Sequence, residues 1–502
     1  MEERPRLQTG PREIRPSGII GGPPETWPWW KCNPPPTAGG PELYPNNVEQ
    51  PNPRWTPSQE SGHSGLDRVR KAARKDGKLR FTALLHHVTI NLLRSSYFQL
   101  KRKAAPGVDG VRWEEYGRDL EARLSDLHGR IHRGAYRAQP SRRVWIPKPD
   151  GRQRPLGIAS LEDKIVQAAV GEVLNQIWEE DFLGFSYGFR PRRSQHDALD
   201  ALTVGIVRKK VNWVLDLDIR SFFDQVEHDW MIPFVEHRIG DRGIVRLIQK
   251  WLKAGVKEEG QWHETEEGTP QGSGISPLLA NLYLHYVLDL WVDQWRRKKA
   301  TGDVIIVRYA ADAVLGFQHR QEADRFLEER QGRMAKFGLE LHPEKTRLME
   351  FGRYAAQRRA KRGEGRPETF NFLGFTHFCG TSHKTGYFTV LRQTMSKRQA
   401  AKLKQIQDEL CQRLHQSLAD TAKWLQAVVR GYFNYHAIPG NEERLDLFRK
   451  DVMRRWLRQL RRRSQRHRWT WERFLSHFGT LLPEVCVLHQ YPTERFDAKH
   501  PR

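Results

Sequence analysis

The alternation of apolar and acidic side chains along residues 211–219 restricts the fold of this chain more than any other sequence feature. Two aspartates, Asp216 and Asp218, alternate there with Leu215, Leu217 and Ile219. A period of two places the apolar set on one face of a β-strand and the acidic set on the other. The segment is therefore predicted to be a strand with one buried and one polar face, on which both aspartates point the same way.

A pair of strands is predicted further along the chain. Residues 304–308 and 313–317 are apolar runs separated by a short Tyr-Ala-Ala-Asp segment, which indicates a β-hairpin with Asp312 near its tip. A carboxylate on a strand and another at a hairpin tip can converge on divalent metal ions, as phosphoryl transfer requires. Asp218 and Asp312 are the candidates, although a strand aspartate taken alone is more often solvated or a capping residue.

The charge balance indicates the class of partner. Lys and Arg number 84 against 60 Asp and Glu, a formal charge of +24 that favours a polyanion, with nucleic acid as the leading candidate. Between Arg444 and Arg473 twelve basic residues stand against three acidic ones. The four cysteines are too far apart for a zinc-binding pair and favour a reduced cytosolic setting. The most apolar long stretch, residues 274–288, is too short to cross a bilayer, so no membrane span is expected.

The ends of the chain differ from its centre. Fourteen of the 29 prolines fall in the first 60 residues, so residues 1–65 are predicted to be a poorly ordered arm, whose tryptophans either dock on a partner or stay solvated. A helix is predicted after Ser160, which can form a capping box with Asp163, because apolar residues recur at helical spacing from Ile165 to Trp178. Beyond about residue 395 the pattern becomes helical and basic.

Several segments, in the order in which they occur, resemble the motifs of group II intron-encoded reverse transcriptases. They are Ile-Pro-Lys-Pro-Asp-Gly at 146–151, Asp-Leu-Asp-Ile-Arg-Ser-Phe-Phe-Asp at 216–224, Gly-Thr-Pro-Gln-Gly-Ser-Gly-Ile-Ser-Pro at 268–277 and Arg-Tyr-Ala-Ala-Asp-Ala-Val-Leu-Gly-Phe at 308–317. Shorter matches lie at 105–110, 185–191, 341–346, 372–375 and 430–435. Each motif alone is a weak signal, but so many in order make coincidence negligible.

The resemblance implies an α+β right-hand polymerase fold. Residues 66–390 would form the fingers and an antiparallel palm sheet, residues 391–480 a basic α-helical thumb, called the maturase domain or domain X, and residues 481–502 a tail. The implied activities are RNA-directed DNA polymerisation and assistance to splicing and retrohoming. No Cys- and His-rich endonuclease domain is expected, because the chain stops soon after its basic segment.

The resemblance also implies roles for residues around the metal. Asp218, Asp312 and the backbone carbonyl of Ile219 would hold two Mg²⁺ ions, which activate the primer 3′ hydroxyl and neutralise the departing pyrophosphate. Lys345 matches a lysine proposed to protonate the pyrophosphate, although an exposed loop lysine would look the same.

Other residues are implied to bind the incoming deoxynucleotide (dNTP). The candidates are Lys148, Arg154, Phe223, Gln271 and Gly272. Lys148 and Arg154 would hold the triphosphate, and the Phe223 ring would exclude a 2′-hydroxyl. Gly272 would let the backbone approach the nucleotide and template closely, with Gln271 in support. The plain alternatives are surface charges, a core aromatic and an ordinary glycine-rich turn.

The hairpin departs from the family pattern at one position. Family members carry Tyr-Ala-Asp-Asp where this chain has Tyr309, Ala310, Ala311 and Asp312, so one of three metal carboxylates is missing. Fewer oxygens and less negative charge predict weakened metal binding and severely reduced polymerisation. The isolated change resembles a deliberate inactivating substitution, with natural loss and retained RNA binding as the alternative, and the sequence leaves both origins open.

The implied partners are the chain's own intron RNA, a DNA target and a primer, in the bacterial cytoplasm or nucleoid. RNA contacts are predicted for Arg190, Arg192, Arg193, Arg430, Arg454, Arg455, Arg458, Arg461, Arg462, Arg463, Arg466 and Arg468. Most tryptophans among the C-terminal arginines are expected to pack between helices. Two rival functions stay open: an RNA-binding maturase without polymerase activity, and a domesticated reverse transcriptase of a phage-defence or CRISPR-associated system.

Overall fold

The structure is a computed structural model that describes residues 63–147, 153–264, 267–269, 272–382, 386–463 and 466–500. Most of the predicted arm lies outside the described residues, as do Lys148 and Gln271. Among the helices that the structure describes, none is both long and apolar enough to span a bilayer.

Helix α5 (Leu161–Asp181) lies within the larger hydrophobic core. The Ser160 hydroxyl caps it by accepting a hydrogen bond from the Asp163 backbone nitrogen at 3.2 Å. Its inner face is fully buried from Ile165 to Trp178, which confirms the predicted helix. The other helices of this region are α1 (His63–Lys75), η2 (Leu85–His87), α2 (Ile90–Gln99), α3 (Trp113–Tyr116), η3 (Gly117–Asp119), α4 (Leu120–His132), α7 (His228–Arg238), α8 (Arg242–Leu252) and α9 (Ser276–Leu284).

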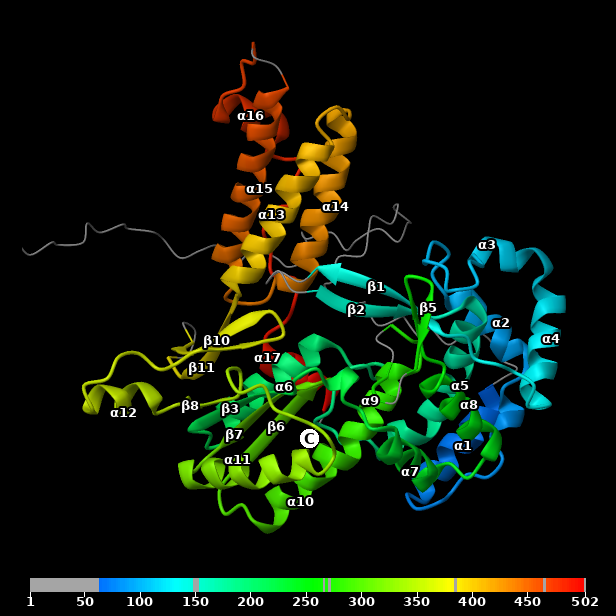
Figure 1. The fold of residues 1–502 in the computed structure, drawn as a ribbon. Helices are drawn as coiled ribbons and strands as arrows, with labels where there is room; N and C mark the ends of the chain where they lie inside the picture. The colour runs from blue at the N-terminus through cyan, green and yellow to red at the C-terminus, as the bar shows by residue number, and fades with distance from the viewer. Residues whose placement is uncertain are drawn as a thin grey trace, which may run out of the picture. The chain divides into compact units, whose positions relative to one another are not determined.

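A small sheet joins two hairpins that are distant in the sequence. Strand β1 (Ser141–Pro147) is antiparallel to β2 (Gln153–Ile158) and parallel to β4 (Val256–Glu258), which pairs with β5 (Gln261–His263). The order is β2-β1-β4-β5, and Figure 1 shows β1 and β2 side by side. This sheet therefore places Ser141 and Arg142 of β1 beside Val256 and Lys257 of β4, in the segment that precedes the 268–277 motif.

The central sheet contains the predicted strand and the predicted hairpin. Its order is β6-β7-β3-β8, and every neighbouring pair is antiparallel. The strands are β3 (Trp213–Asp218), β6 (Val304–Tyr309), β7 (Asp312–Phe317) and β8 (Arg347–Glu350). Two predictions, the strand at 211–219 and the hairpin at 304–317, are thereby confirmed.

Helices cover both faces of the central sheet. Leu215 and Leu217 pack into the larger core, on the side crossed by α11 (Arg320–Ala335). Val214 packs on the opposite side, in a second cluster with α6 (Gln195–Arg208). This is the face of β3 that carries Asp216 and Asp218 and that was predicted to be polar. It is partly buried, because α6 covers the end of β3 before the two aspartates. Two further helices are η5 (His285–Asp289), a short π-helix, and α10 (Leu290–Lys298).

The last part of the described chain is a three-stranded sheet followed by helices. The sheet has the order β11-β10-β9, from β9 (Phe370–Phe372), β10 (Phe375–Thr381) and β11 (Phe388–Thr394). The helices run alongside one another around a third hydrophobic cluster (Figure 1). They are α13 (Ser396–Gln412), α14 (Leu418–His436), α15 (Glu442–Arg462) and α16 (Trp471–Phe478), with α12 (Ala355–Lys361) before the sheet. Below, α13 to α16 are called the C-terminal bundle.

The segment after the C-terminal bundle returns to helix α6. The Leu488 backbone nitrogen donates to the carbonyl of Ala437 at 2.9 Å, and α17 (Pro492–Lys499) then packs along α6. Ion pairs join the two helices, from Arg208 to Asp497 at 2.7 Å and from Lys499 to Asp197 at 2.6 Å. Within the predicted tail, residues 492–499 thus form a helix that packs on α6, which covers one face of the central sheet.

Candidate active site

Two aspartates meet at one end of the central sheet. Asp218 is the last residue of β3, Asp312 is the first residue of β7, and the two are directly opposite in the register of these antiparallel strands. Residues opposite one another in an antiparallel pair place their side chains on the same face. The Asp218 side chain is 22% exposed, and Asp312 is exposed. The structure therefore brings together the two residues predicted to bind metal.

A third carboxylate, Asp216, lies behind this pair. It precedes Asp218 by two residues and so shares its face of β3. Burial, together with the negative charges of Asp312 and Asp218, raises the pKa of Asp216 to about 7. The two-residue period predicted that Asp216 lies on the polar face, but no role was predicted for it. Its burial depends on what packs against β3, which the period does not report.

Lys345 lies beside the aspartates. Its ammonium forms an ion pair with the Asp218 carboxylate. The backbone holds this arrangement, because the His342 nitrogen donates to the Asp218 carbonyl at 2.9 Å and the Arg220 nitrogen donates to the Glu340 carbonyl at 2.9 Å. These bonds lie on either side of Ile219, and neither uses its carbonyl. The structure thus places Lys345 and the Ile219 backbone, two predicted site residues, next to Asp218.

The hairpin turn holds Ala311, the position at which the resemblance implies another aspartate. Tyr309 pairs with Asp312, so Ala310 and Ala311 form the turn between β6 and β7. Ala311 is partly buried against the larger core, and its methyl group offers no oxygen to a cation. The carboxylates of Asp218 and Asp312 have the oxygen chemistry that Mg²⁺ prefers. Within the described residues, no group of three or more His, Cys, Asp or Glu side chains is placed to hold a metal ion.

The residues predicted to bind a nucleotide occupy different surroundings. Phe223, in η4 (Phe222–Asp224), is partly buried, with its ring 6.3 Å from that of Phe189. Arg154 is exposed on β2, opposite Ile146 of β1. The other two candidates, Lys148 and Gln271, lie outside the described residues.

Gly272 has a structural reason of its own to be glycine. Its φ is +106°, and an added Cβ would lie 2.6 Å from the Gly157 carbonyl oxygen of β2. Both the positive φ and this close approach exclude larger residues. The structure therefore shows the Gly272 backbone close to strand β2. The prediction gave Gly272 a contact with the nucleotide and did not include this contact with β2.

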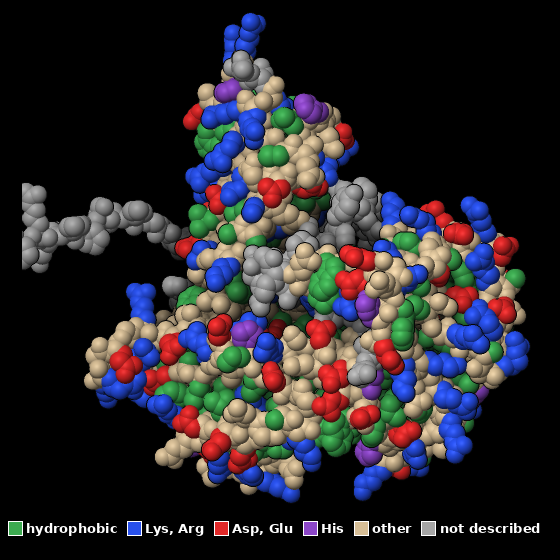
Figure 2. Space-filling view, viewed as in Figure 1, with side chains coloured by type: hydrophobic (Ala, Val, Ile, Leu, Met, Phe, Trp, Pro, Cys, Tyr) green, Lys and Arg blue, Asp and Glu red, His purple; other side chains and the backbone are tan. Residues whose placement is uncertain are grey.

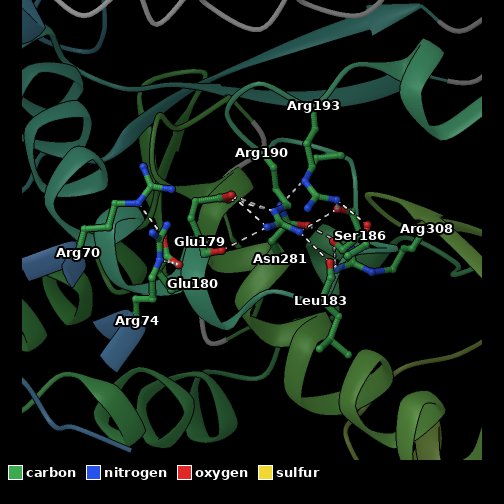
Figure 3. Close-up of polar contacts among 12 residues, drawn as sticks. Arg70, Arg74, Glu179, Glu180, Leu183, Ser186, Arg190, Arg193, Asn281 and Arg308 are labelled. Carbon is green, nitrogen blue, oxygen red and sulfur yellow. Dashed lines mark hydrogen bonds and ion pairs between the residues drawn. The ribbon is translucent and has the colours of Figure 1, made fainter. Parts of the chain in front are cut away.

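Arg190 is placed where it cannot serve as the predicted RNA contact. Its side chain is 2% exposed and forms an ion pair with Glu179 at 3.0 Å. Its guanidinium also donates to the carbonyls of Leu183 and Ser186, at 2.8 and 2.9 Å. Figure 3 shows Arg190 enclosed by these partners. The prediction that Arg190 binds RNA is therefore corrected to a structural role. Its guanidinium N–H groups donate to partners inside the protein.

The neighbouring arginines differ in exposure. Arg193 is partly buried and donates to the Ser186 carbonyl at 3.1 Å (Figure 3). Its guanidinium also lies over the Tyr187 ring. Burial lowers the pKa of Arg193. Arg192 is exposed and therefore stays accessible to a partner.

Most of the predicted C-terminal arginines lie on the surface of the C-terminal bundle. Figure 2 shows Lys and Arg side chains over this part of the molecule. The exposed ones are Arg430, Arg454, Arg458, Arg461, Arg462, Arg466 and Arg468, whereas Arg455 and Arg463 are partly buried. Trp456 is 1% exposed, and Trp469 and Trp471 pack on the same cluster. The expectation that these tryptophans pack between helices is confirmed.

Comparison with known proteins identifies the region that contains this site. Residues 146–377 match the reverse transcriptase (RNA-dependent DNA polymerase) family. This region of the chain is similar to reverse transcriptases. The matched residues include β3, β7 and Lys345, so the two aspartates lie inside a reverse transcriptase domain.

Curated relatives include intron-encoded proteins. Protein YkfC of Escherichia coli is 39% identical over 220 residues, 42% of this chain and 58% of the relative. The group II intron-encoded protein LtrA of Lactococcus lactis is 35% identical over 235 residues, 46% of this chain and 39% of the relative. The putative COX1/OXI3 intron 1 protein of Saccharomyces cerevisiae is 32% identical over 207 residues, 41% of this chain and 24% of the relative. The resemblance to group II intron reverse transcriptases and maturases is thus confirmed, although the chain matches only a quarter to three fifths of each relative.

Proposed function

We propose that this chain is a group II intron-encoded reverse transcriptase and maturase whose polymerase activity is strongly reduced by Ala311. The observation that carries the proposal is the register of β3 and β7, which places Asp218 opposite Asp312. Two carboxylates with a lysine beside one of them suit metal-assisted phosphoryl transfer. An RNA template, a DNA primer and dNTPs are the proposed substrates.

The chain's own residues would hold the reacting groups. Asp218, Asp312 and the Ile219 carbonyl are the proposed ligands of two Mg²⁺ ions. Bound Mg²⁺ would activate the primer 3′ hydroxyl and neutralise charge on the departing pyrophosphate. Lys345 would leave its ion pair with Asp218 and donate a proton to the pyrophosphate. The partly buried Phe223 ring would lie against the nucleotide's sugar.

The remaining regions of the fold complete the proposal. Residues 66–390 are proposed as fingers and palm, and the C-terminal bundle, within residues 391–480, as the thumb or domain X. The exposed arginines of the bundle support intron RNA as the partner, because guanidinium groups bind phosphates. As a maturase the chain would stabilise its folded intron RNA, and during retrohoming it would copy that RNA at a DNA target.

One observation favours a second function, a maturase without polymerase activity. Ala311 contributes no oxygen at the hairpin turn, while the Lys345 ammonium already neutralises Asp218. RNA binding by the C-terminal bundle needs none of these residues. The second function therefore predicts that splicing assistance survives the loss of both Asp218 and Asp312.

Primer extension distinguishes the two functions. The parent chain, Ala311→Asp, and Ala311→Asp with Asp218→Asn would be compared on an annealed RNA template and DNA primer with Mg²⁺ and dNTPs. Restoring a metal ligand should raise synthesis at least about a hundredfold, and Asp218→Asn should remove the gain. If every variant is inert yet binds intron RNA tightly, the maturase function stands alone. If none binds RNA, both proposals are wrong.

A further inference from the structure

A fully buried arginine, Arg308, stands next to the hairpin turn of the candidate site. It is the fifth residue of β6, and its side chain is 0% exposed. An isolated charge in a protein interior is very unfavourable unless it is paired and hydrogen-bonded. The partners of Arg308 therefore indicate what this position is for.

The counterion of Arg308 is Asp289 of η5, which is also 0% exposed. The guanidinium donates to both carboxylate oxygens of Asp289, at 2.7 and 2.6 Å. This bidentate geometry fixes the plane of the guanidinium as well as its position. Neutralising the charge would need nothing more, yet Arg308 makes three further hydrogen bonds.

The remaining donors of Arg308 connect three separate segments. One nitrogen donates to the Ala310 carbonyl at 3.0 Å and to the Asn281 side chain at 3.1 Å. The other terminal nitrogen donates to the Ser186 hydroxyl at 2.6 Å. Figure 3 shows Arg308 beside Ser186 and Asn281. The bond to Ala310 is the one that reaches the turn between Tyr309 and Asp312.

The turn needs an external support of this kind. Ala310 has a φ of +55°, a left-handed conformation that is unfavourable for a residue with a Cβ. The residue therefore does not favour the observed shape by itself. A hydrogen bond from a guanidinium with a fixed plane can hold the Ala310 carbonyl in place.

We propose that Arg308 is a positioning residue, which fixes the hairpin turn through the Ala310 carbonyl and thereby sets the place of Asp312 opposite Asp218. Asp289 orients the guanidinium, and Ser186 and Asn281 complete its hydrogen bonds. The inference deepens the proposed function, on which its metal-binding part rests. Arg308 would act on the metal only through the turn.

The test removes the pair without leaving a buried charge behind. In Arg308→Met with Asp289→Leu both charges are replaced by apolar groups of similar size, a change that is often neutral for stability. A second variant, Arg308→Lys, keeps a charge beside Asp289 but loses the planar fork that spans the acceptors. The matched control is Arg238→Met with Asp181→Leu, which removes another buried pair, joined at 2.9 Å and 1% and 15% exposed, on α7 and α5.

Two measurements are made on the full chain. Hydrogen exchange reports the opening of the turn at residues 310–313, and electron paramagnetic resonance with Mn²⁺ reports metal affinity. Both Arg308 variants should exchange at the turn about tenfold faster and bind Mn²⁺ about tenfold more weakly, whereas the control stays within about twofold of the parent.

The outcomes separate this inference from the proposed function. Exchange at the turn equal to that of the control, in either folded Arg308 variant, would overturn the role of Arg308. Asp218→Asn should weaken Mn²⁺ binding in the parent chain. If it has no effect, the proposed metal site is wrong, while hydrogen exchange still decides whether Arg308 fixes the turn.

Discussion

A single glycine shows how closely the candidate site is packed. Gly188 lies against the hairpin turn, and a Cβ added to it would overlap the backbone nitrogen of Ala310. The Gly188 carbonyl is held by the Asn281 side chain at 2.6 Å, so this segment cannot shift easily. The turn is therefore confined by Gly188 at the Ala310 nitrogen and by Arg308 at the Ala310 carbonyl. At the scale of residues, the site depends on neighbours that take no part in the proposed reaction.

Gly188→Ala should destabilise the protein by about 1–3 kcal/mol, because backbone atoms must move to admit the methyl group. Urea unfolding measures the change. Gly184→Ala is the matched control in the same segment, since its added Cβ meets nothing within 4 Å. The control should stay within about 0.5 kcal/mol of the parent. Equal losses of unfolding free energy in Gly188→Ala and Gly184→Ala would show that the turn can move.

At the scale of elements, one buried aspartate joins three segments that are far apart in the sequence. Asp200 of α6 is 1% exposed. Its carboxylate accepts a hydrogen bond from Arg392 of β11 at 3.2 Å and forms an ion pair with Arg495 of α17. The Arg495 guanidinium also contacts the ring of His489 at 3.0 Å. The helix that covers the central sheet is thus tied to the strand before the C-terminal bundle and to the segment after it.

Asp200→Asn should lower the free energy of unfolding by about 3–5 kcal/mol, because it leaves Arg392 and Arg495 without their shared counterion. Asp497→Asn removes the ion pair with Arg208 in the same α6–α17 interface. The Asp497 side chain is 46% exposed. Solvent screening limits this second loss to about 1 kcal/mol or less. Denaturant unfolding compares the two. A small loss for Asp200→Asn would mean that the buried ion pair with Arg495 contributes little to holding α17 on α6.

At the scale of the whole molecule, the net charge of +24 favours a polyanionic partner. Some arginines are paired with carboxylates inside the protein and are not accessible to such a partner, as the pairs of Arg190, Arg308 and Arg392 show. The exposed arginines of the C-terminal bundle are a better measure of what a phosphate backbone would meet. The number of phosphates bound can be determined from the salt dependence of RNA affinity.

Arg454→Gln with Arg458→Gln should weaken binding to structured intron RNA and reduce the slope of log affinity against log salt by about 2, one for each phosphate contact. Filter binding across a series of KCl concentrations measures the slope. Arg246→Gln, an exposed arginine on α8, is the control and should leave the slope unchanged. An unchanged slope in the double variant would exclude this face of α15 from the RNA interface.

The sequence by itself determined the parts of this protein that depend on local pattern. The alternation around Asp216 and Asp218 fixes a strand, because side chains repeat every two residues in extended backbone. The apolar spacing after Ser160 fixes a buried helix in the same way. The ordered motifs showed the resemblance to group II intron reverse transcriptases, which implies an acidic residue at the position of Ala311.

Only the tertiary structure decided which of these residues meet. The register that places Asp218 opposite Asp312, the ion pair with Lys345 and the burial of Asp216 all depend on segments that are about a hundred residues apart. The internal role of Arg190 depends on its surroundings in the same way, because an arginine in a motif looks the same whether its partner is a phosphate or Glu179. Local periodicity carries no information on such long-range packing, so the sequence supplied the candidate residues and the fold selected among them.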